Sequence, residues 1–187
     1  MRVVAGTARG RTLQAPPGKN TRPTSDRVRE SIFNSLNSMD LIDGASVLDL
    51  FAGSGALGIE ALSRNAATVT FVESDRAAAR TIADNIERCG FADRTQVSTV
   101  TAERFLTTRT SRDWFDLALV DPPYAFDAWR ELLVALPARA VVIESDRTVE
   151  VPPEWHVQRE RSYGGTVVQF ATRDHQESAR DLQEQMR

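Results

Sequence analysis

The fold is decided by residues 47–58, which read Val47-Leu48-Asp49-Leu50-Phe51-Ala52-Gly53-Ser54-Gly55-Ala56-Leu57-Gly58. The first five residues form a short apolar run typical of a buried strand, and residues 57–64 have the length and composition of a helix. The glycines between them satisfy the G-x-G-x-x-G pattern of a strand–turn–helix unit that brings its backbone close to a cofactor. The stretch therefore predicts one unit of an open α/β sheet.

Short apolar runs continue to alternate with helix-length segments after this unit. Such alternation is typical of parallel strands joined by right-handed crossovers. We expect strands at 47–51, 68–73, 96–100, 115–120 and 140–144, and helices at 57–64, 76–89, 102–108 and 128–136. The chain between 155–161 and 166–171 contains Tyr163-Gly164-Gly165, which predicts a tight reversal because glycine accepts a positive φ. The sheet should therefore close with an antiparallel hairpin.

The segment before this sheet is basic. Residues 1–30, which we name the basic arm, hold seven basic and two acidic side chains, an excess of five positive charges in a chain of net charge −3. A solvated surface segment could have this composition, but a basic arm on an acidic body favours a polyanionic partner such as nucleic acid. We expect a short hairpin and loop over 1–21 and a helix over 24–36, capped by Thr24, Ser25 or Asp26.

These patterns suggest three parts: a basic RNA-binding extension at 1–43, a catalytic domain at 44–173 and a charged tail at 174–187. No apolar run has the length of a signal peptide or a membrane span, so we expect a cytoplasmic protein without a membrane partner. Cys89 is the only cysteine, and the two histidines lack metal-ligand spacing. We therefore expect no metal site.

A carboxylate decides which cofactor the glycine turn binds. Glu73 ends the next strand, 20 residues after Gly53, where a carboxylate can hold two ribose hydroxyls of either a nicotinamide dinucleotide or S-adenosylmethionine. Asp49 lies just under the turn, where its charge would repel a pyrophosphate but suit the ammonium group of S-adenosylmethionine. The alternative for Asp49 is a buried, hydrogen-bonded capping residue. The pattern favours S-adenosylmethionine.

The fourth strand runs directly into Asp121-Pro122-Pro123-Tyr124. Ligands of an open α/β sheet bind beyond the carboxyl ends of its strands, so this loop should adjoin the glycine turn. The Asp121 carboxylate and the Pro122 carbonyl form an acceptor pair that could hold the two N–H bonds of an aromatic amine. Tyr124 could stack on a base that has left its own stack. We therefore predict that Asp121, Pro122 and Tyr124 form the catalytic site for methylation of an exocyclic amine.

Together these residues resemble those of class I S-adenosylmethionine methyltransferases with an Asp/Asn-Pro-Pro-Tyr/Phe signature. More narrowly, the chain resembles the bacterial 16S rRNA guanine-N2 methyltransferases of the RsmD type. Nearly the whole chain takes part, through residues 2–6 with 9–11, 22–30, 49–55, 121–124 and 163–166.

The resemblance implies a Rossmann-like, mostly parallel sheet of seven strands, with a small N-terminal hairpin and helix that help to grip 16S rRNA. We expect the protein to bind this RNA within the small ribosomal subunit. It places Arg22, Thr24 and Arg27 close to the active site, with Thr24 among the cofactor contacts. It also places Thr101 and Ala102 at the adenine ring. With Arg9 and Arg11 these arginines are the expected RNA contacts, and the full expected cofactor set is Thr24, Asp49, Phe51, Gly53, Gly55, Glu73, Ser74, Thr101, Ala102 and Asp121.

Three other functions compete with guanine-N2 methylation. Methylation of adenine N6 or cytosine N4 in DNA or RNA uses the same chemistry, although 187 residues leave little room for a separate DNA-recognition domain. A nicotinamide oxidoreductase is disfavoured by Asp49. A non-catalytic RNA-binding assembly factor is disfavoured because the cofactor and acceptor motifs are both intact.

Overall fold

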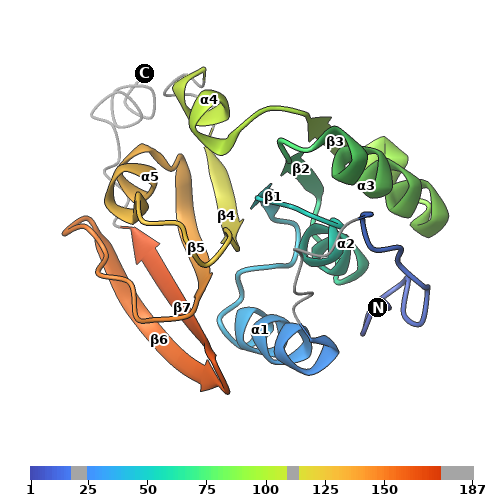
Figure 1. Ribbon diagram of the computed structural model, residues 1–187. Helices are drawn as coiled ribbons and strands as arrows, with labels where there is room; N and C mark the ends of the chain where they lie inside the picture. The colour runs from blue at the N-terminus through green and yellow to red at the C-terminus, as the bar shows by residue number, and fades with distance from the viewer. Residues whose placement is uncertain (18–24, 109–113, 174–187) are drawn as a thin grey trace, which may run out of the picture.

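A seven-stranded sheet with helices on both faces forms the body of the protein in the computed structural model, which describes residues 1–17, 25–108 and 114–173 (Figure 1). The strands are β1 (Ser46–Leu50), β2 (Thr68–Val72), β3 (Thr95–Ser98), β4 (Phe115–Val120), β5 (Ala138–Ser145), β6 (Trp155–Tyr163) and β7 (Thr166–Arg173). The helices are α1 (Asp26–Ser38), α2 (Ala56–Ser63), α3 (Arg76–Cys89), α4 (Ala102–Thr107) and α5 (Trp129–Ala135), with a short 3₁₀ helix η1 (Ala92–Arg94).

The strand order is β3-β2-β1-β4-β5-β7-β6. Strands β1 to β5 pair in parallel, and β7 runs antiparallel to both β5 and β6. The predicted α/β class, with a mostly parallel sheet of seven strands and a closing antiparallel hairpin, is confirmed.

Successive buried residues of the central strands belong alternately to two different hydrophobic cores, as the two-residue period of a strand requires. Val47 packs in a core that also contains buried side chains of α1, α2 and α3, whereas the next residue, Leu48, packs in a core that contains those of α4 and α5. The central strands are mostly apolar because both faces of the sheet are covered.

Helix α2 lies very close to the sheet because residue 58 is a glycine. A Cβ atom built on Gly58 would lie 2.3 Å from the Phe71 ring of β2, so a larger residue would push the helix away. This contact fixes the amino end of α2, and with it the glycine turn, against the carboxyl ends of the strands.

Most expected elements are present, with ends that differ by one or two residues. Helix α1 begins at Asp26, and of its three candidate caps Ser25 is the one observed, because its side chain accepts the Val28 N–H at 3.2 Å. Strand β3 ends at Ser98 rather than at 100. Among the described residues its one neighbouring strand is β2, which ends opposite it at Val72, so the described chain offers no strand that could pair with the residues beyond Ser98.

Candidate active site

The register of the three central strands brings the predicted cofactor and acceptor residues to one edge of the sheet. Leu50 of β1 pairs with Val72 of β2 and with Val120 of β4. The residues that follow these three are Phe51, Glu73 and Asp121, so they leave the sheet side by side. The strand order reverses between β1 and β4, which is where ligands bind in open α/β sheets.

A cavity of about 400 Å³ opens at this edge. Its walls are mainly apolar, and Glu73 provides a carboxylate beside them. Four further residues expected at the cofactor line it, and Pro123 of the acceptor motif does so as well. The complete lining is Phe51, Val72, Glu73, Ser74, Val100, Thr101, Ala102, Glu103, Pro123, Ala125 and Phe126.

Glu73 is held in place by backbone groups. One of its carboxylate oxygens accepts the Gly53 N–H at 2.8 Å, and the other accepts the Asp75 N–H at 2.8 Å. The carboxylate therefore joins the glycine turn to the end of β2. Each oxygen keeps a second lone pair that could accept a ligand hydroxyl. Gly55, the other glycine of the turn expected at the cofactor, is the N-cap residue of α2 and adopts a left-handed conformation.

Asp49 is buried under the same turn. Only 1% of its surface is exposed, and its Oδ2 atom accepts the Gly58 N–H at the start of α2 at 2.9 Å. Burial raises the pKa of the Asp49 carboxyl well above its usual value; the Gly58 N–H opposes this shift, and the nearby Asp121 and Glu73 charges add to it. Asp49 thus has the capping contact that the sequence left open as an alternative, and its contact with an ammonium group stays a prediction.

The acceptor motif follows β4 as a short loop. Asp121 is partly buried, Pro122 is buried, and the Tyr124 ring is 39% exposed. The loop is closed by the Phe126 N–H, which donates to the Pro123 carbonyl at 2.8 Å. Tyr124 is therefore partly accessible to a ligand, in the same loop as Pro123, which lines the cavity. The catalytic roles of Asp121, Pro122 and Tyr124 stay predictions.

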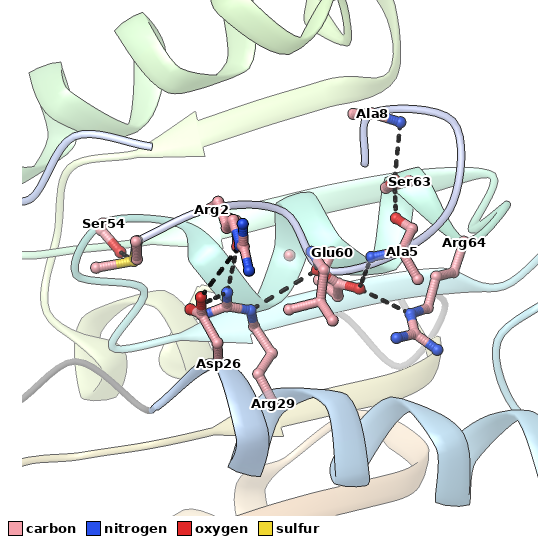
Figure 2. A network of polar contacts seen from close by, with 12 residues as sticks. Arg2, Ala5, Ala8, Asp26, Arg29, Ser54, Glu60, Ser63 and Arg64 are labelled. Carbon is pink, nitrogen blue, oxygen red and sulfur yellow. Dashed lines mark hydrogen bonds and ion pairs between the residues drawn. The ribbon is translucent and has the colours of Figure 1, made fainter. Parts of the chain in front are cut away.

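The described part of the basic arm packs against α2 and α3. A fully buried carboxylate, Glu60 of α2, accepts the Val4 N–H at 2.7 Å and the Ala5 N–H at 3.0 Å. Figure 2 shows that Arg29 of α1, also fully buried, lies between this carboxylate and Asp26, with its Nε atom 3.7 Å from Glu60 and an Nη atom 2.9 Å from Asp26. The arm is therefore attached to the helix that begins at the glycine turn.

The arginines expected to contact RNA have different environments. Arg9 and Arg27 are exposed and line a second cavity of about 340 Å³, which lies within the arm between residues 2–10 and the first residues of α1. Arg11 instead donates to the Arg88 carbonyl at the end of α3, at 2.7 Å. Arg22 and Thr24 lie outside the described residues. The RNA contacts of all four arginines, and the division of the chain at 43 and 173, stay predictions.

Several residues of this region carried no recognisable signal in the sequence. Phe126 lines the cavity and makes edge-to-face contacts with Phe51 and Trp129, and Arg147 donates to the Phe126 carbonyl at 3.3 Å. Glu60 was detectable in principle, because it is the only charged residue of an otherwise apolar helix.

Within the described residues, no group of three side chains is arranged to hold a metal ion. The helices in the same part of the chain are too short or too polar to cross a membrane.

The chain is similar to known proteins over most of its length. A family model described as "Conserved hypothetical protein 95" matches residues 1–172. The ribosomal RNA small subunit methyltransferase D of Escherichia coli K12 is 36% identical over 186 residues, which cover 94% of this chain and 91% of that protein. YlbH of Bacillus subtilis, provisionally named an rRNA methyltransferase, is 39% identical over 179 residues, which cover 90% of this chain and 96% of that protein.

Solved structures have the same fold. An Escherichia coli structure, yhhF, provisionally described as a methyltransferase, superposes with a TM-score of 0.82 at 35% identity and covers 94% of this chain and 99% of that one. The family match extends over almost the whole chain, and both relatives are more than 30% identical over most of their length. The chain therefore belongs to the conserved hypothetical protein 95 family of RsmD-type methyltransferases.

Proposed function

We propose that this protein transfers a methyl group from S-adenosylmethionine to the exocyclic N2 amine of a guanine in 16S rRNA. One observation carries the proposal: Glu73, which accepts the Gly53 N–H of the glycine turn, and Pro123 of the acceptor motif line the same cavity. A cofactor bound there would lie directly beside the residues that could hold an amine. The names of the relatives, which include ribosomal RNA small subunit methyltransferases, support the choice of substrate.

The residues at the cavity fit an adenosyl group. Phe51, Val100 and Phe126 offer apolar surface to an adenine ring, and Glu73 offers two oxygens to ribose hydroxyls. Burial raises the pKa of the Asp49 carboxyl, and the nearby charge of Asp121 adds to the rise. A cation bound beside these two carboxyls would favour their charged forms. When bound, S-adenosylmethionine supplies an electrophilic methyl group on a positively charged sulfur.

The acceptor motif would hold and orient the amine. The lone pair of an aryl amine is delocalised into its ring, so the amine is a weak nucleophile. The Asp121 carboxylate and the Pro122 carbonyl would accept its two N–H bonds, direct its lone pair toward the methyl carbon and stabilise the positive charge that develops on nitrogen. The surplus proton can leave the nitrogen after transfer, so the motif needs no separate general base.

The basic arm would grip the RNA around the target base. Arg9 and Arg27 are exposed at one cavity, and the anchoring of the arm through Glu60 holds this surface in a fixed place relative to the glycine turn. Guanidinium groups are suited to phosphate because they bind it through two parallel hydrogen bonds.

Methyl transfer with identification of the product nucleoside tests the proposal. The full chain is incubated with isotope-labelled S-adenosylmethionine and with small ribosomal subunits from cells that lack the protein, and the rRNA is then digested and analysed by mass spectrometry. We expect the label in N2-methylguanosine at a single site. Label in N6-methyladenosine or N4-methylcytidine would support the competing function instead. If neither the assembled subunits nor protein-free 16S rRNA acquired label, methyl transfer to rRNA would be refuted.

A further inference from the structure

The turn between β6 and β7 reaches the acceptor motif. The hydroxyl oxygens of Tyr124 and Thr166 lie 3.3 Å apart, although 42 residues separate them in the chain. Thr166 is only 6% exposed, whereas the Tyr124 ring is 39% exposed. A buried hydroxyl on the sheet thus contacts the tip of an exposed aromatic ring on a loop.

Thr166 is well placed to act as a fixed anchor. It is the first residue of β7, it pairs with Tyr163 at the end of β6, and β7 is flanked on both sides by other strands. The Tyr163 hydroxyl also forms a hydrogen bond with the side chain of Ser31 in α1. The end of the hairpin is therefore joined to both the sheet and α1.

Tyr124 gains from such an anchor because the backbone around it belongs to no helix or strand. It lies in a loop between β4 and α5, and its neighbours Pro123 and Ala125 are exposed. An exposed tyrosine can rotate about both of its side-chain torsions. A ring that must stack on a base accelerates the reaction more when its plane is already set.

We propose that Thr166 is a positioning residue of the acceptor site, whose hydroxyl holds the Tyr124 ring in the orientation in which the ring stacks on the target base. The inference rests on the proposed function, which makes Tyr124 the stacking residue. It adds the β6–β7 turn to the machinery that recognises the substrate.

Ring mobility tests the contact without any assay of activity. The chain has two tyrosines, so ¹³C labelling of tyrosine rings yields two sets of NMR signals, which Tyr163→Phe assigns. Thr166→Val removes the hydroxyl and keeps the branched shape, and Thr166→Ser keeps the hydroxyl. We expect relaxation measurements to show a more mobile Tyr124 ring in Thr166→Val, an unchanged Tyr163 ring, and wild-type order in Thr166→Ser. An equally ordered Tyr124 ring in Thr166→Val would overturn the inference.

A double-mutant cycle tests whether the contact serves the reaction. Thr166→Val should lower kcat/KM for the RNA roughly threefold to tenfold, as expected for the loss of one neutral hydrogen bond, and should leave S-adenosylhomocysteine affinity unchanged. Because the effect passes through one bond, adding Tyr124→Phe should cause little further loss. Losses that multiply would overturn the inference. A wild-type chain that methylates no guanine amine would refute the proposed function, and ring mobility would still decide whether Thr166 holds Tyr124.

Discussion

The two halves of the candidate site are held by different kinds of contact. In the cofactor half, formed by the glycine turn with Asp49 and Glu73, both carboxylates accept backbone N–H groups at 2.8 to 2.9 Å. In the acceptor half, formed by residues 121–124, Tyr124 is exposed and its hydroxyl reaches a side chain at 3.3 Å.

This difference implies that the two halves are preorganised to different degrees. Backbone groups packed against the sheet hold the carboxylates of the cofactor half, so this half is preorganised before any ligand arrives. The acceptor half offers an exposed ring that a flipped base can cover. Substitutions in the two halves should therefore separate cofactor binding from methyl transfer.

The largest effect is expected at Asp121. Asp121→Ala should lower the rate of methyl transfer by about a hundredfold or more, because it removes an acceptor that acts on the reacting amine. Affinity for S-adenosylhomocysteine, measured by calorimetry, should change little. Glu131→Ala, which removes an exposed carboxylate on α5, is the control and should behave as wild type. A normal rate in Asp121→Ala would mean that Asp121 is structural.

The next effect belongs to the cofactor half. Glu73→Ala and Asp49→Ala should each weaken S-adenosylhomocysteine binding by about 1.5 to 3 kcal/mol, the typical contribution of a hydrogen bond to a charged group. Glu73→Gln keeps one acceptor oxygen and should lose less. Saturating cofactor should restore much of the transfer rate to the Glu73 variants. If the transfer rate of the Glu73 variants stays low at saturating cofactor, Glu73 contributes to methyl transfer as well as to cofactor binding, and the two halves do not have separate roles.

The buried Asp49 carboxyl predicts a dependence on pH. Its pKa is raised, and a bound ammonium group would favour the charged form, so binding should release a proton. Affinity for S-adenosylhomocysteine should therefore rise as pH rises through the Asp49 pKa. Calorimetry in buffers of different ionisation enthalpy measures the released proton. In Asp49→Asn this contribution should be absent, and a proton release that persists there would assign it to another group.

Asp49→Asn, which is expected to abolish the proton release on binding, should also increase the stability of the folded protein at neutral pH. A carboxyl with a raised folded-state pKa contributes stability below its unfolded pKa, near 4, and this contribution is lost as pH rises through the folded value. Asp49→Asn cannot ionise and can still accept the Gly58 N–H. Its melting temperature at neutral pH should therefore exceed that of wild type, by about 2 to 4 °C for each kcal/mol gained.

The smallest effect is expected in the basic arm. Arg9→Ala should make the slope of log affinity for RNA against log salt less negative by roughly 0.7 to 0.9, the value for one lost phosphate contact. S-adenosylhomocysteine affinity should not change. Arg130→Ala removes an exposed arginine on α5, on the other face of the sheet, and should leave the slope unaltered. If both variants have the wild-type slope, RNA phosphate does not contact Arg9. Arg11→Ala should also loosen the arm, since Arg11 donates to the end of α3.

The sequence was most informative where a function depends on a local pattern. The alternation of strands and helices, the glycine turn and the spacing of Glu73 from Gly53 all follow from residues close together in the chain, and the sheet that they predict is the one observed. For Asp49 the sequence left two environments open, because a residue type does not reveal which backbone N–H faces it. The observed contact with Gly58 depends on how α2 packs on β1.

Other parts of the site depend on contacts between distant segments. Phe126 reaches the cavity through a loop conformation that Arg147, 21 residues later, helps to hold. Glu60 binds backbone groups 55 and 56 residues away. The partner of Tyr124 lies on β7, 42 residues later in the chain. No periodicity or motif encodes these pairs, so they become visible only when the sheet is assembled.

The most direct test of the central claim, that the edge formed by β1, β2 and β4 is built for a methyl donor, is calorimetric titration of the full-length chain with S-adenosylhomocysteine and, separately, with NAD. We predict that S-adenosylhomocysteine binds to a single site, that Glu73→Ala weakens this binding, and that NAD gives no comparable heat. Tight binding of NAD without a response to S-adenosylhomocysteine would contradict the account.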